Sequence, residues 1–313
     1  MNSDDNNGKN DFEYSRSEPR DTGSGELRDN GSRAYHRPPE NHRRHKWPAV
    51  VGIVLIVILA SNMVIGTALY RFNIDGFTAA GDEIYGTLHF AESEISNLDV
   101  RLVNARVEIS PHDGRDLLVE FIPPNIGRYN RPLYEIVGDR LVVAEPTAGR
   151  WGFFVFNFNI RSGTLAISVP RDADGFFDDF SVRNTNGVIS CAAGSNHFAN
   201  TARLNTTNGA ITARDIYAGR IDISSTNGAL NISNLSARTI EAGTTNGAIV
   251  AENVDVSRDL SLRTTNGAIS LRDSQILDTL VARTTNGGIT LSNVDADMDR
   301  ADLSTTNGRV VIN

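Results

Sequence analysis

Hydrophobic and polar residues alternate in short runs toward the C-terminus of the chain, and each run ends in the same turn. In one copy Leu260 and Leu262 lie between polar side chains, so one face of the run is apolar and the other is polar. This period of two is typical of a half-buried β-strand. The run ends at Asn266-Gly267, a pair that favours positive φ and a sharp turn, and the alternation resumes at Ile269. Each copy therefore predicts two or three short strands joined by tight corners.

The Asn-Gly turn recurs seven times along the chain. Successive Asn residues lie 22, 19, 19, 20, 20 and 21 positions apart, and a period near 20 is the length of one coil of a solenoid rather than of a globular domain. The predicted structural corners are Asn186 and Gly187, Asn208 and Gly209, Asn227 and Gly228, Asn246 and Gly247, Asn266 and Gly267, Asn286 and Gly287, and Asn307 and Gly308.

A unit of about 20 residues with one apolar edge cannot bury that edge alone. Stacked units can bury it by pairing parallel strands between coils about 4.8 Å apart, and the corner Asn side chains then form a ladder that satisfies their amides. The pattern predicts an all-β fold, a right-handed single-stranded β-solenoid. Asn104 follows a similar apolar run and precedes Ala105 where Gly is expected, which indicates a degenerate N-terminal coil and places the solenoid domain over 95–313. Cys191 lies on the apolar phase and is predicted to be a core residue.

The residue directly before each corner Asn lies on the polar phase of the repeat. In a stack these residues form an exposed row, and the candidate ligand face consists of Thr207, Thr226, Thr245, Thr265, Thr285 and Thr306. Two interpretations are open. The row is either a structural corner that only completes the turn, or a flat strip that binds a ligand through its hydroxyl groups.

Three segments of different composition precede the solenoid domain. Residues 1–46 carry nine acidic and nine basic side chains and almost no aliphatic residue, so we expect a disordered tail. Ala49 to Tyr70 is an uncharged run of 22 residues, long enough at about 1.5 Å per residue to span a hydrocarbon core of about 30 Å. We therefore predict a transmembrane signal-anchor helix over 47–70, followed by a linker over 71–94.

Charges on the two sides of the apolar run predict its orientation. Arg43, Arg44 and Lys46 precede the run, whereas Asp82 and Glu83 follow it. The positive-inside rule places the tail in the cytoplasm and the C-terminal domain outside the cell. The sequence thus predicts a single-pass protein of the plasma membrane with a cytoplasmic N-terminus and an extracytoplasmic solenoid.

The two ends of a stack expose apolar strand edges unless they are covered. The aromatic run 151–158 is expected either to cap one end as a hairpin or to form an exposed apolar patch. The last coil has no evident cap in the sequence at 310–313, which favours self-association through the C-terminal coil.

Charge and composition limit the chemistry of the chain. The formal net charge is -8, and because the tail is close to neutral the acidic charge belongs to the solenoid part, which argues against a nucleic-acid partner. One acidic run resembles a calcium loop but lacks the Gly at its sixth position and the Glu at its twelfth, so at most a weak cation site stays open there. This run contains Asp295, Asp297, Asp299 and Asp302. No His pair has metal-ligand spacing, and no nucleophile elbow or phosphate-binding loop is present, so the sequence predicts no catalytic residue, no metal and no cofactor.

The repeated Thr-Thr-Asn-Gly-Ala-Ile type of motif resembles that of a known family. The motif is preceded by a strand that ends in Val169-Pro170 and by the segment 180–187, which carries its first copy. Together these features resemble the membrane-anchored proteins called putative adhesins, whose toastrack-like β-solenoid is a domain of unknown function. The resemblance covers about residues 90–313. It implies an extracytoplasmic surface or sensory domain, often in bacterial envelopes, and it supplies no catalytic residues.

Three functions are compatible with these observations. The leading hypothesis is a non-enzymatic, membrane-anchored surface protein for adhesion, ligand sensing or scaffolding, whose partner is a cell-surface glycan or a protein. The first alternative is a polysaccharide-active β-helix enzyme, although the short and regular coils offer no long loops to build a groove wall. The second alternative is a structural solenoid that assembles with itself.

Overall fold

A computed structural model of the chain describes residues 81–91, 93–125, 129–145, 162–171, 177–194 and 198–313. The predicted tail at 1–46, the predicted membrane span at 47–70 and the aromatic run 151–158 lie outside these residues. Across the ranges that are described, no helix is long and apolar enough to cross a membrane. All described residues belong to one compact unit, Asn73–Asn313.

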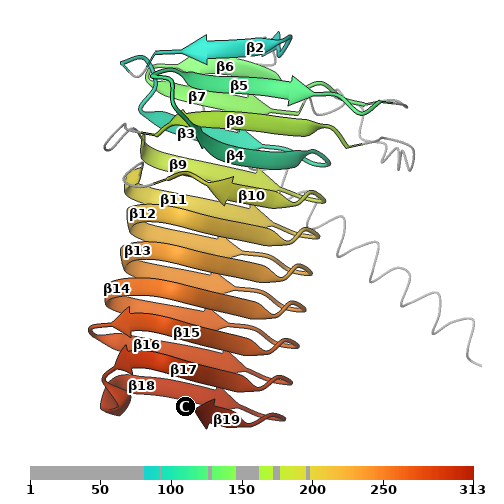
Figure 1. Cartoon of the computed structure of the whole chain (residues 1–313). Coiled ribbons are helices and arrows are strands. Elements are labelled where there is room, and N and C mark those ends of the chain that lie inside the picture. The colour runs from blue at the N-terminus through green and yellow to red at the C-terminus, as the bar shows by residue number, and fades with distance from the viewer. Residues whose placement is uncertain (1–80, 92, 126–128, 146–161, 172–176, 195–197) are drawn as a thin grey trace, which may run out of the picture. The chain divides into compact units, whose positions relative to one another are not determined.

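The described part of the chain is almost wholly β-structure, and its one helix is the short 3-10 helix η1 (Met298–Arg300) (Figure 1). The N-terminal part, residues 81–171, contains β1 (Asp82–Glu83), β2 (Thr87–Phe90), β3 (Asn97–Arg101), β4 (Arg106–His112), β5 (Leu117–Ile122), β6 (Leu133–Val137), β7 (Arg140–Ala144) and β8 (Thr164–Pro170). The regular part, residues 177–313, contains β9 (Phe177–Asn184), β10 (Ile189–Ala192), β11 (Phe198–Thr206), β12 (Ile211–Ser224), β13 (Leu230–Gly243), β14 (Ile249–Arg263), β15 (Ile269–Ile276), β16 (Thr279–Thr284), β17 (Ile289–Ala296), β18 (Ala301–Thr305) and β19 (Val310–Ile312).

Each segment of the regular part pairs in parallel with the equivalent segment of the next coil, so the coils stack in chain order (Figure 1). The ladder after the corners aligns Ile211, Leu230, Ile249, Ile269, Ile289 and Val310. The ladder before the corners aligns Leu204, Ile223, Ala242, Leu262, Ala282 and Leu303. The all-β solenoid predicted from the repeat is therefore confirmed, because repeats that are neighbours in sequence are also neighbours in the sheet.

The inward columns of these ladders form one hydrophobic core along the stack. Ile211 and Leu230 are fully buried, and burying such a side chain stabilises the fold by about 1.5–3 kcal/mol. Cys191 is also fully buried, in register with Ile109 and Ala213 of the neighbouring coils, which confirms its predicted core position. Burial raises the pKa of its thiol, so the group that would act as a nucleophile, the thiolate, is disfavoured.

The corner glycines correct one expectation from the sequence, because none of them has positive φ. A Cβ on Gly247 would lie 2.0 Å from the carbonyl oxygen of Gly228, and one on Gly228 would lie 1.7 Å from that of Gly209. No side chain fits at such a distance. Glycine is thus required by the close approach of one coil to the previous coil, and not by the backbone conformation of the turn.

A second corner, whose residues the sequence analysis did not identify, carries the positive φ angles. At this corner the φ values lie between 48° and 55°, in the left-handed region that Asn and Asp tolerate better than other side chains. The residues are Asp215, Asn234, Asn253, Asp273 and Asn293. The chain turns here without leaving the sheet, so β12, β13 and β14 continue around this corner into the next coil.

The N-terminal part has a stacking order that differs from the chain order. β3 lies between β7 and β9, and β4 lies between β8 and β10, all in parallel pairs. The coil formed by β3 and β4, with Asn104 and Ala105 at its corner, is the degenerate coil that the sequence indicated. It stacks between the regular part and a coil, β7 with β8, that comes later in the chain.

Antiparallel strands cover the outer edge of β7 and β8. β6 pairs with β7 and β1 with β6, while β5 pairs with β8 and β2 with β5. β1 and β2 fall within the predicted linker 71–94, and at two and four residues they are too short to show a periodicity in the sequence. The Arg131 guanidinium holds this region together, because it donates to the Ile84 carbonyl at 2.7 Å and lies 4.4 Å from the centroid of the Tyr85 ring.

The last coil carries apolar side chains that remain partly exposed. Val310 is 38% exposed and Ile312 is 56% exposed, whereas their counterparts Ile289 and Leu291 in the preceding coil are fully buried. Self-association through this coil stays a prediction.

Candidate binding groove

The corner Asn side chains form a hydrogen-bonded ladder along the stack, which we call the Asn ladder. Each Asn after the first donates from Nδ2 to Oδ1 of the Asn in the neighbouring corner on the N-terminal side, at 2.6–2.8 Å. Its members are Asn104, Asn186, Asn208, Asn227, Asn246, Asn266, Asn286 and Asn307. Because these amides bond one another, the predicted corner residues serve the stack and are poor candidates for binding a ligand.

The two residues before each corner Asn have opposite roles. The first of them is buried, and its hydroxyl donates to the carbonyl oxygen of the corner Gly in the previous coil at 2.7–3.1 Å. These donors are Thr206, Ser225, Thr244, Thr264, Thr284 and the half-buried Thr305. The second residue points outward, so the two neighbouring hydroxyls of the motif differ in what they can bind.

The second residues form an exposed row, which we call the Thr row. Its members are Thr207, Thr226, Thr245, Thr265, Thr285 and Thr306, and all six are exposed. Within the described ranges none of their hydroxyls has a hydrogen-bond partner. Their backbone groups are used between coils; the Thr245 carbonyl, for example, accepts from the Asn266 amide at 2.9 Å. The row therefore presents free hydroxyl groups on a backbone that is fixed in place.

A shallow, open groove of about 600 Å³ lies beside the C-terminal half of this row, and we call it the Thr groove. One wall carries Thr245, Thr265, Thr285 and Thr306. The other wall carries the residues that directly precede each motif, namely Ser224, Gly243, Arg263, Arg283 and Ser304. The buried hydroxyl residues of the motif form its floor. The predicted ligand face is thus divided, because Thr207 and Thr226 belong to the row but do not line the groove.

The wall opposite the Thr row is a column of residues in register. Ser224 pairs with Gly243, Gly243 with Arg263, Arg263 with Arg283, and Arg283 with Ser304, so the wall extends over five successive coils. Gly243 has no side chain, and the nearest atom to a Cβ built there is the Arg263 carbonyl oxygen at 3.7 Å. Gly243 is thus an opening in the wall, with space that a larger side chain would occupy.

Two arginines supply the charge of the groove. Arg283 forms an ion pair with Asp302, which lies beside the groove; this partner raises the pKa of Arg283, and the guanidinium lowers the pKa of Asp302. Arg263 donates to the Ser261 hydroxyl and forms no ion pair in the part of the chain that is described, although its charge helps to lower the pKa of Asp302. No Asp or Glu lines the groove itself.

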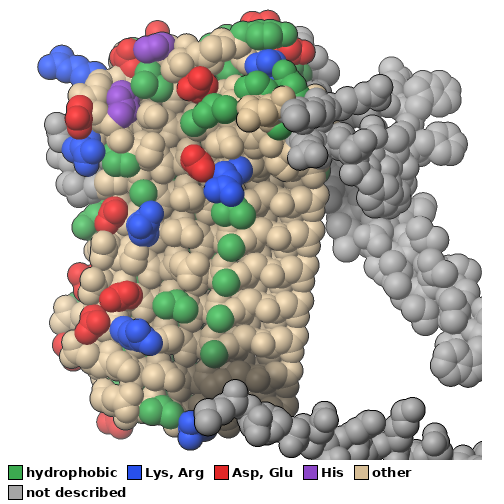
Figure 2. Space-filling model, turned by 45° about the vertical axis from the view of Figure 1, so that its right-hand side comes forward, with side chains coloured by type: hydrophobic (Ala, Val, Ile, Leu, Met, Phe, Trp, Pro, Cys, Tyr) green, Lys and Arg blue, Asp and Glu red, His purple; other side chains and the backbone are tan. Residues whose placement is uncertain are grey.

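Side chains of one kind gather in columns on the surface of the stack. Figure 2 shows one face, on which a vertical column of hydrophobic side chains repeats from coil to coil. Uncharged polar side chains and backbone fill the surface to the right of this column. The repeat therefore places like side chains above one another on the surface as well as in the core.

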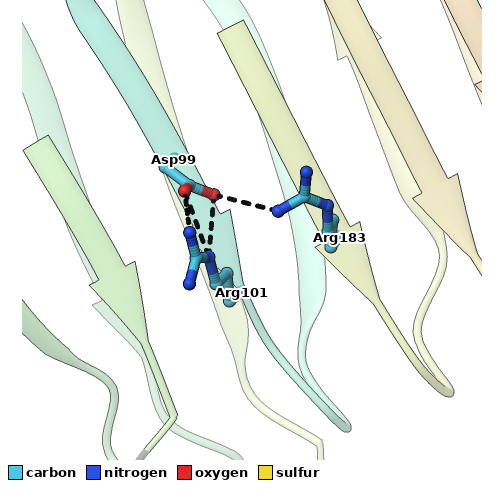
Figure 3. Close-up of polar contacts among 3 residues, drawn as sticks. All are labelled: Asp99, Arg101 and Arg183. Atoms are coloured by element: carbon cyan, nitrogen blue, oxygen red, sulfur yellow. Dashed lines mark hydrogen bonds and ion pairs between the residues drawn. The ribbon is translucent and has the colours of Figure 1, made fainter. Parts of the chain in front are cut away.

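A polar cluster in the N-terminal half of the stack joins β3 to β9. Asp99 on β3 is buried and accepts from the guanidinium of Arg101 with both oxygens, while Arg183 on β9 lies 3.9 Å from its Oδ1 (Figure 3). These three side chains link the neighbouring strands β3 and β9.

The acidic run near the C-terminus does not converge on one point. Asp295 accepts from Gln275 at 3.2 Å, Asp297 caps η1 and lies 3.5 Å from Arg300, and Asp302 is held by an arginine of the groove. Among the described residues, no three His, Cys, Asp or Glu side chains are grouped so that they could hold a metal ion. Asp295, Asp297 and Asp302 thus each have a partner within the chain.

A second, smaller hollow of about 380 Å³ lies on another face of the stack. It is lined by Tyr217, Ala218, Ser236, Ala237, Arg238, Asp255, Val256, Ser257, Gln275 and Leu277. Tyr217 and Leu277 are exposed there, at 38% and 62%. The hollow lacks the repeated hydroxyl groups of the Thr groove, so we regard the Thr groove as the stronger candidate site.

The repeat and the stack together identify the family. Residues 95–313 match the family model described as Toastrack DUF4097. The chain belongs to this family. The match confirms the resemblance to this family that was stated from the sequence. No curated protein matches the chain.

Three solved structures are similar to this Toastrack protein, at low identity and with low TM-scores. A putative cell adhesion protein from Clostridium sporogenes is 10% identical, with a TM-score of 0.28, and the match covers 72% of this chain and 96% of that one. A putative adhesin from Bacteroides fragilis is 10% identical, with a TM-score of 0.30 and the same two coverages. A putative lipid binding protein from Parabacteroides distasonis is 12% identical, with a TM-score of 0.35, and the match covers 74% of this chain and 98% of that one.

Proposed function

We propose that this Toastrack protein is a non-enzymatic surface protein that binds an extended polysaccharide in the Thr groove. In this proposal the apolar segment 47–70 anchors the chain in the plasma membrane, and the solenoid is displayed outside the cell. The observation that carries the proposal is the line of exposed Thr hydroxyls without partners along one wall of a groove. Hydroxyls both donate and accept hydrogen bonds, as sugars do, so they suit a ligand rich in hydroxyl groups.

The repeat of the groove favours a polymer over a compact ligand. Five residues in register form one wall, and at about 4.8 Å per coil they extend over about 19 Å. A sugar unit in an extended glycan has a length similar to one coil. A linear glycan that lies along the stack would therefore meet an equivalent set of groups at each coil.

The composition of the groove favours binding over cleavage. Most glycoside hydrolases use a pair of carboxyl groups, one as acid and one as base or nucleophile. The residues that line the groove include no Asp, Glu or His. Asp302 lies beside the groove, but its carboxylate is held by Arg283. This distribution supports a binding role and disfavours the alternative of a polysaccharide-active enzyme.

The test is a calorimetric titration of the purified full-length protein with neutral and acidic linear polysaccharides. The triple variant T245V/T265V/T285V removes three hydroxyls of the wall and keeps the shape of the side chains. We expect its affinity to fall by about tenfold or more. The control variant T212V/T290V removes hydroxyls on β12 and β17, away from the groove, and is expected to bind as the wild type does. Equal binding by the triple variant and the wild type would rule out the Thr groove as the site.

A further inference from the structure

We propose, on the basis of the function above, that the polysaccharide is acidic and carries carboxylates on successive sugars, and that Arg263 binds one of these carboxylates. The proposal rests on the charge of the groove, on the absence of an ion pair at Arg263 among the described residues, and on the opening at Gly243. It also assigns a role to Asp302, which occupies Arg283 when no ligand is bound.

The groove differs in charge from the rest of the chain. The whole chain has a formal net charge of -8, but the residues that line the groove include two arginines and no acidic side chain. At physiological ionic strength, charges more than about 8 Å apart are largely screened from one another in water. A ligand in the groove therefore interacts mainly with the local positive charge, and the acidic net charge does not exclude an anion.

Arg263 has the geometry of a ligand-binding group. It is exposed, it lines the groove, and in the described residues it lacks the carboxylate partner that Arg203, Arg220 and Arg283 have. A guanidinium presents a planar fork of donors that matches a carboxylate, and such charged hydrogen bonds are stronger than neutral ones. Gly243, its neighbour in register, leaves the adjacent space empty for the acidic group.

Arg283 lies one coil from Arg263 and is already paired. Its guanidinium donates to Asp302, and this contact lowers the pKa of the Asp302 carboxyl group. A second acidic group on the ligand would have to compete with Asp302 for Arg283. Asp302 therefore limits the affinity of the groove for anions, and its removal should strengthen binding.

The experiment compares a polymer with carboxylates, its neutral ester and a polymer with sulfates. The full-length protein is titrated with polygalacturonate, with its methyl ester, in which the carboxylates are neutral, and with dextran sulfate. We expect polygalacturonate to bind most tightly, and Arg263→Gln to weaken that binding about tenfold while leaving binding of the methyl ester unchanged. Arg272→Gln, which removes an exposed charge on β15 outside the groove, is the matched control.

A gain in affinity gives the second readout and does not depend on disrupting the fold. Asp302→Asn is expected to strengthen polygalacturonate binding several-fold, because it frees Arg283 and removes a negative charge. Asp295→Asn removes the same charge from the face of β17 and is expected to have no such effect. Both arginine and aspartate variants are compared at equal ionic strength, because binding of an anion weakens with salt.

The outcomes separate this proposal from the function on which it rests. If polygalacturonate and its ester bind equally, or if Arg263→Gln and Arg272→Gln have the same effect, the acidic specificity is wrong. Loss of ester binding in T245V/T265V/T285V would in that case still support the groove. If only dextran sulfate binds in an Arg263-dependent way, the acidic group is a sulfate and the assignment to carboxylates is overturned. If no polymer binds, both proposals fail.

Discussion

The regular part and the N-terminal part form the same stacked ladders from different chain orders. In the regular part, chain order and stacking order agree and the strand pairs between coils are parallel. In the N-terminal part, the coil of β3 and β4 lies between strands that come later in the chain, and β1, β2, β5 and β6 pair antiparallel at the outer edge. The comparison shows that a coil needs an inward column of apolar side chains and a corner whose polar groups are hydrogen-bonded. The repeated motif adds the agreement between chain order and stacking order.

The corner of the degenerate coil shows how the motif can be replaced. In a regular corner the backbone N–H of the Asn donates to a backbone carbonyl of the previous coil, as that of Asn227 does to Thr207 at 2.8 Å. The backbone N–H of Asn104 instead donates to the side-chain carboxyl group of Glu145 at 3.2 Å. The Glu145 side chain thus supplies the acceptor that a Thr carbonyl supplies in a regular corner. The Asn ladder begins at Asn104.

The largest expected effect tests why the regular corners need glycine. Gly247→Ala places a methyl group at the carbonyl of Gly228, and we expect it to lower the free energy of unfolding by about 3 kcal/mol or more. The control is Gly243→Ala, where the nearest atom lies at 3.7 Å and the expected change is below about 0.5 kcal/mol. Urea unfolding of both variants measures the difference. Equal stability of the two would contradict the requirement for close coil contact.

The next effect compares an internal rung of the Asn ladder with its first rung. Asn246 both donates and accepts, so Asn246→Asp loses the bond to Asn227 and is expected to cost about 1–2 kcal/mol of stability. Asn104 accepts from Asn186, and a carboxylate can still accept, so Asn104→Asp is expected to be nearly neutral. Thermal unfolding compares the two variants. A larger loss for the Asn104 variant would show that the polarity of the ladder is assigned wrongly.

A smaller effect concerns the ladder at the second corner. Asn234 donates to Asp215 and Asn253 donates to Asn234, and a separate bond joins Asn293 to Asp273. Asp273 cannot donate as a carboxylate, so the ladder is interrupted before it. Asp273→Asn is expected to join the two halves and to raise stability by about 0.5–1 kcal/mol, since Asn tolerates the φ of 48°. An unchanged or lower melting temperature would count against this account.

The smallest effect concerns the replaced corner of the N-terminal part. Burial raises the pKa of Glu145, although nearby backbone amides of Asn104, Val103 and Ala105 lower it in part. A carboxyl group with a raised pKa in the folded state holds its proton more tightly there, so stability is lost as the pH rises from the ordinary value through the raised one. Glu145→Gln keeps an acceptor and removes the charge.

We therefore expect the stability of Glu145→Gln, relative to the wild type, to increase as the pH rises from 4 toward 7. Unfolding curves recorded across this range provide the measurement. Parallel pH profiles for the two proteins would show that the Glu145 charge is not desolvated in the folded state.

The period of the fold could be predicted because it depends on residues close in sequence. The alternation around Leu260 and the spacing of the corners are local, and the parallel ladders follow from them. The order of β3 and β7 could not be predicted, because it depends on long connections and not on a local pattern. The positive φ at Asn253 was missed because Asn and Asp vary at that position and no glycine marks it.

The candidate site was predicted in part for a similar reason. The outward phase of Thr245 follows from the alternation, so the Thr row could be inferred from the sequence. Its opposite wall, with Gly243, Arg263 and Arg283, was missed because these residues are not alike. A signal was present, however, since each directly precedes a Thr-Thr-Asn-Gly motif and therefore occupies one column of the stack.

The most direct test of the account is to locate a bound polymer on the solenoid. Threonine methyl resonances of the full-length protein can be followed during titration with polygalacturonate. The account predicts saturable shifts for Thr245, Thr265 and Thr285, and unchanged resonances for Thr212 and Thr290. Shifts confined to Thr212 and Thr290, or binding that leaves all five unchanged, would contradict the claim that the Thr groove is the binding site.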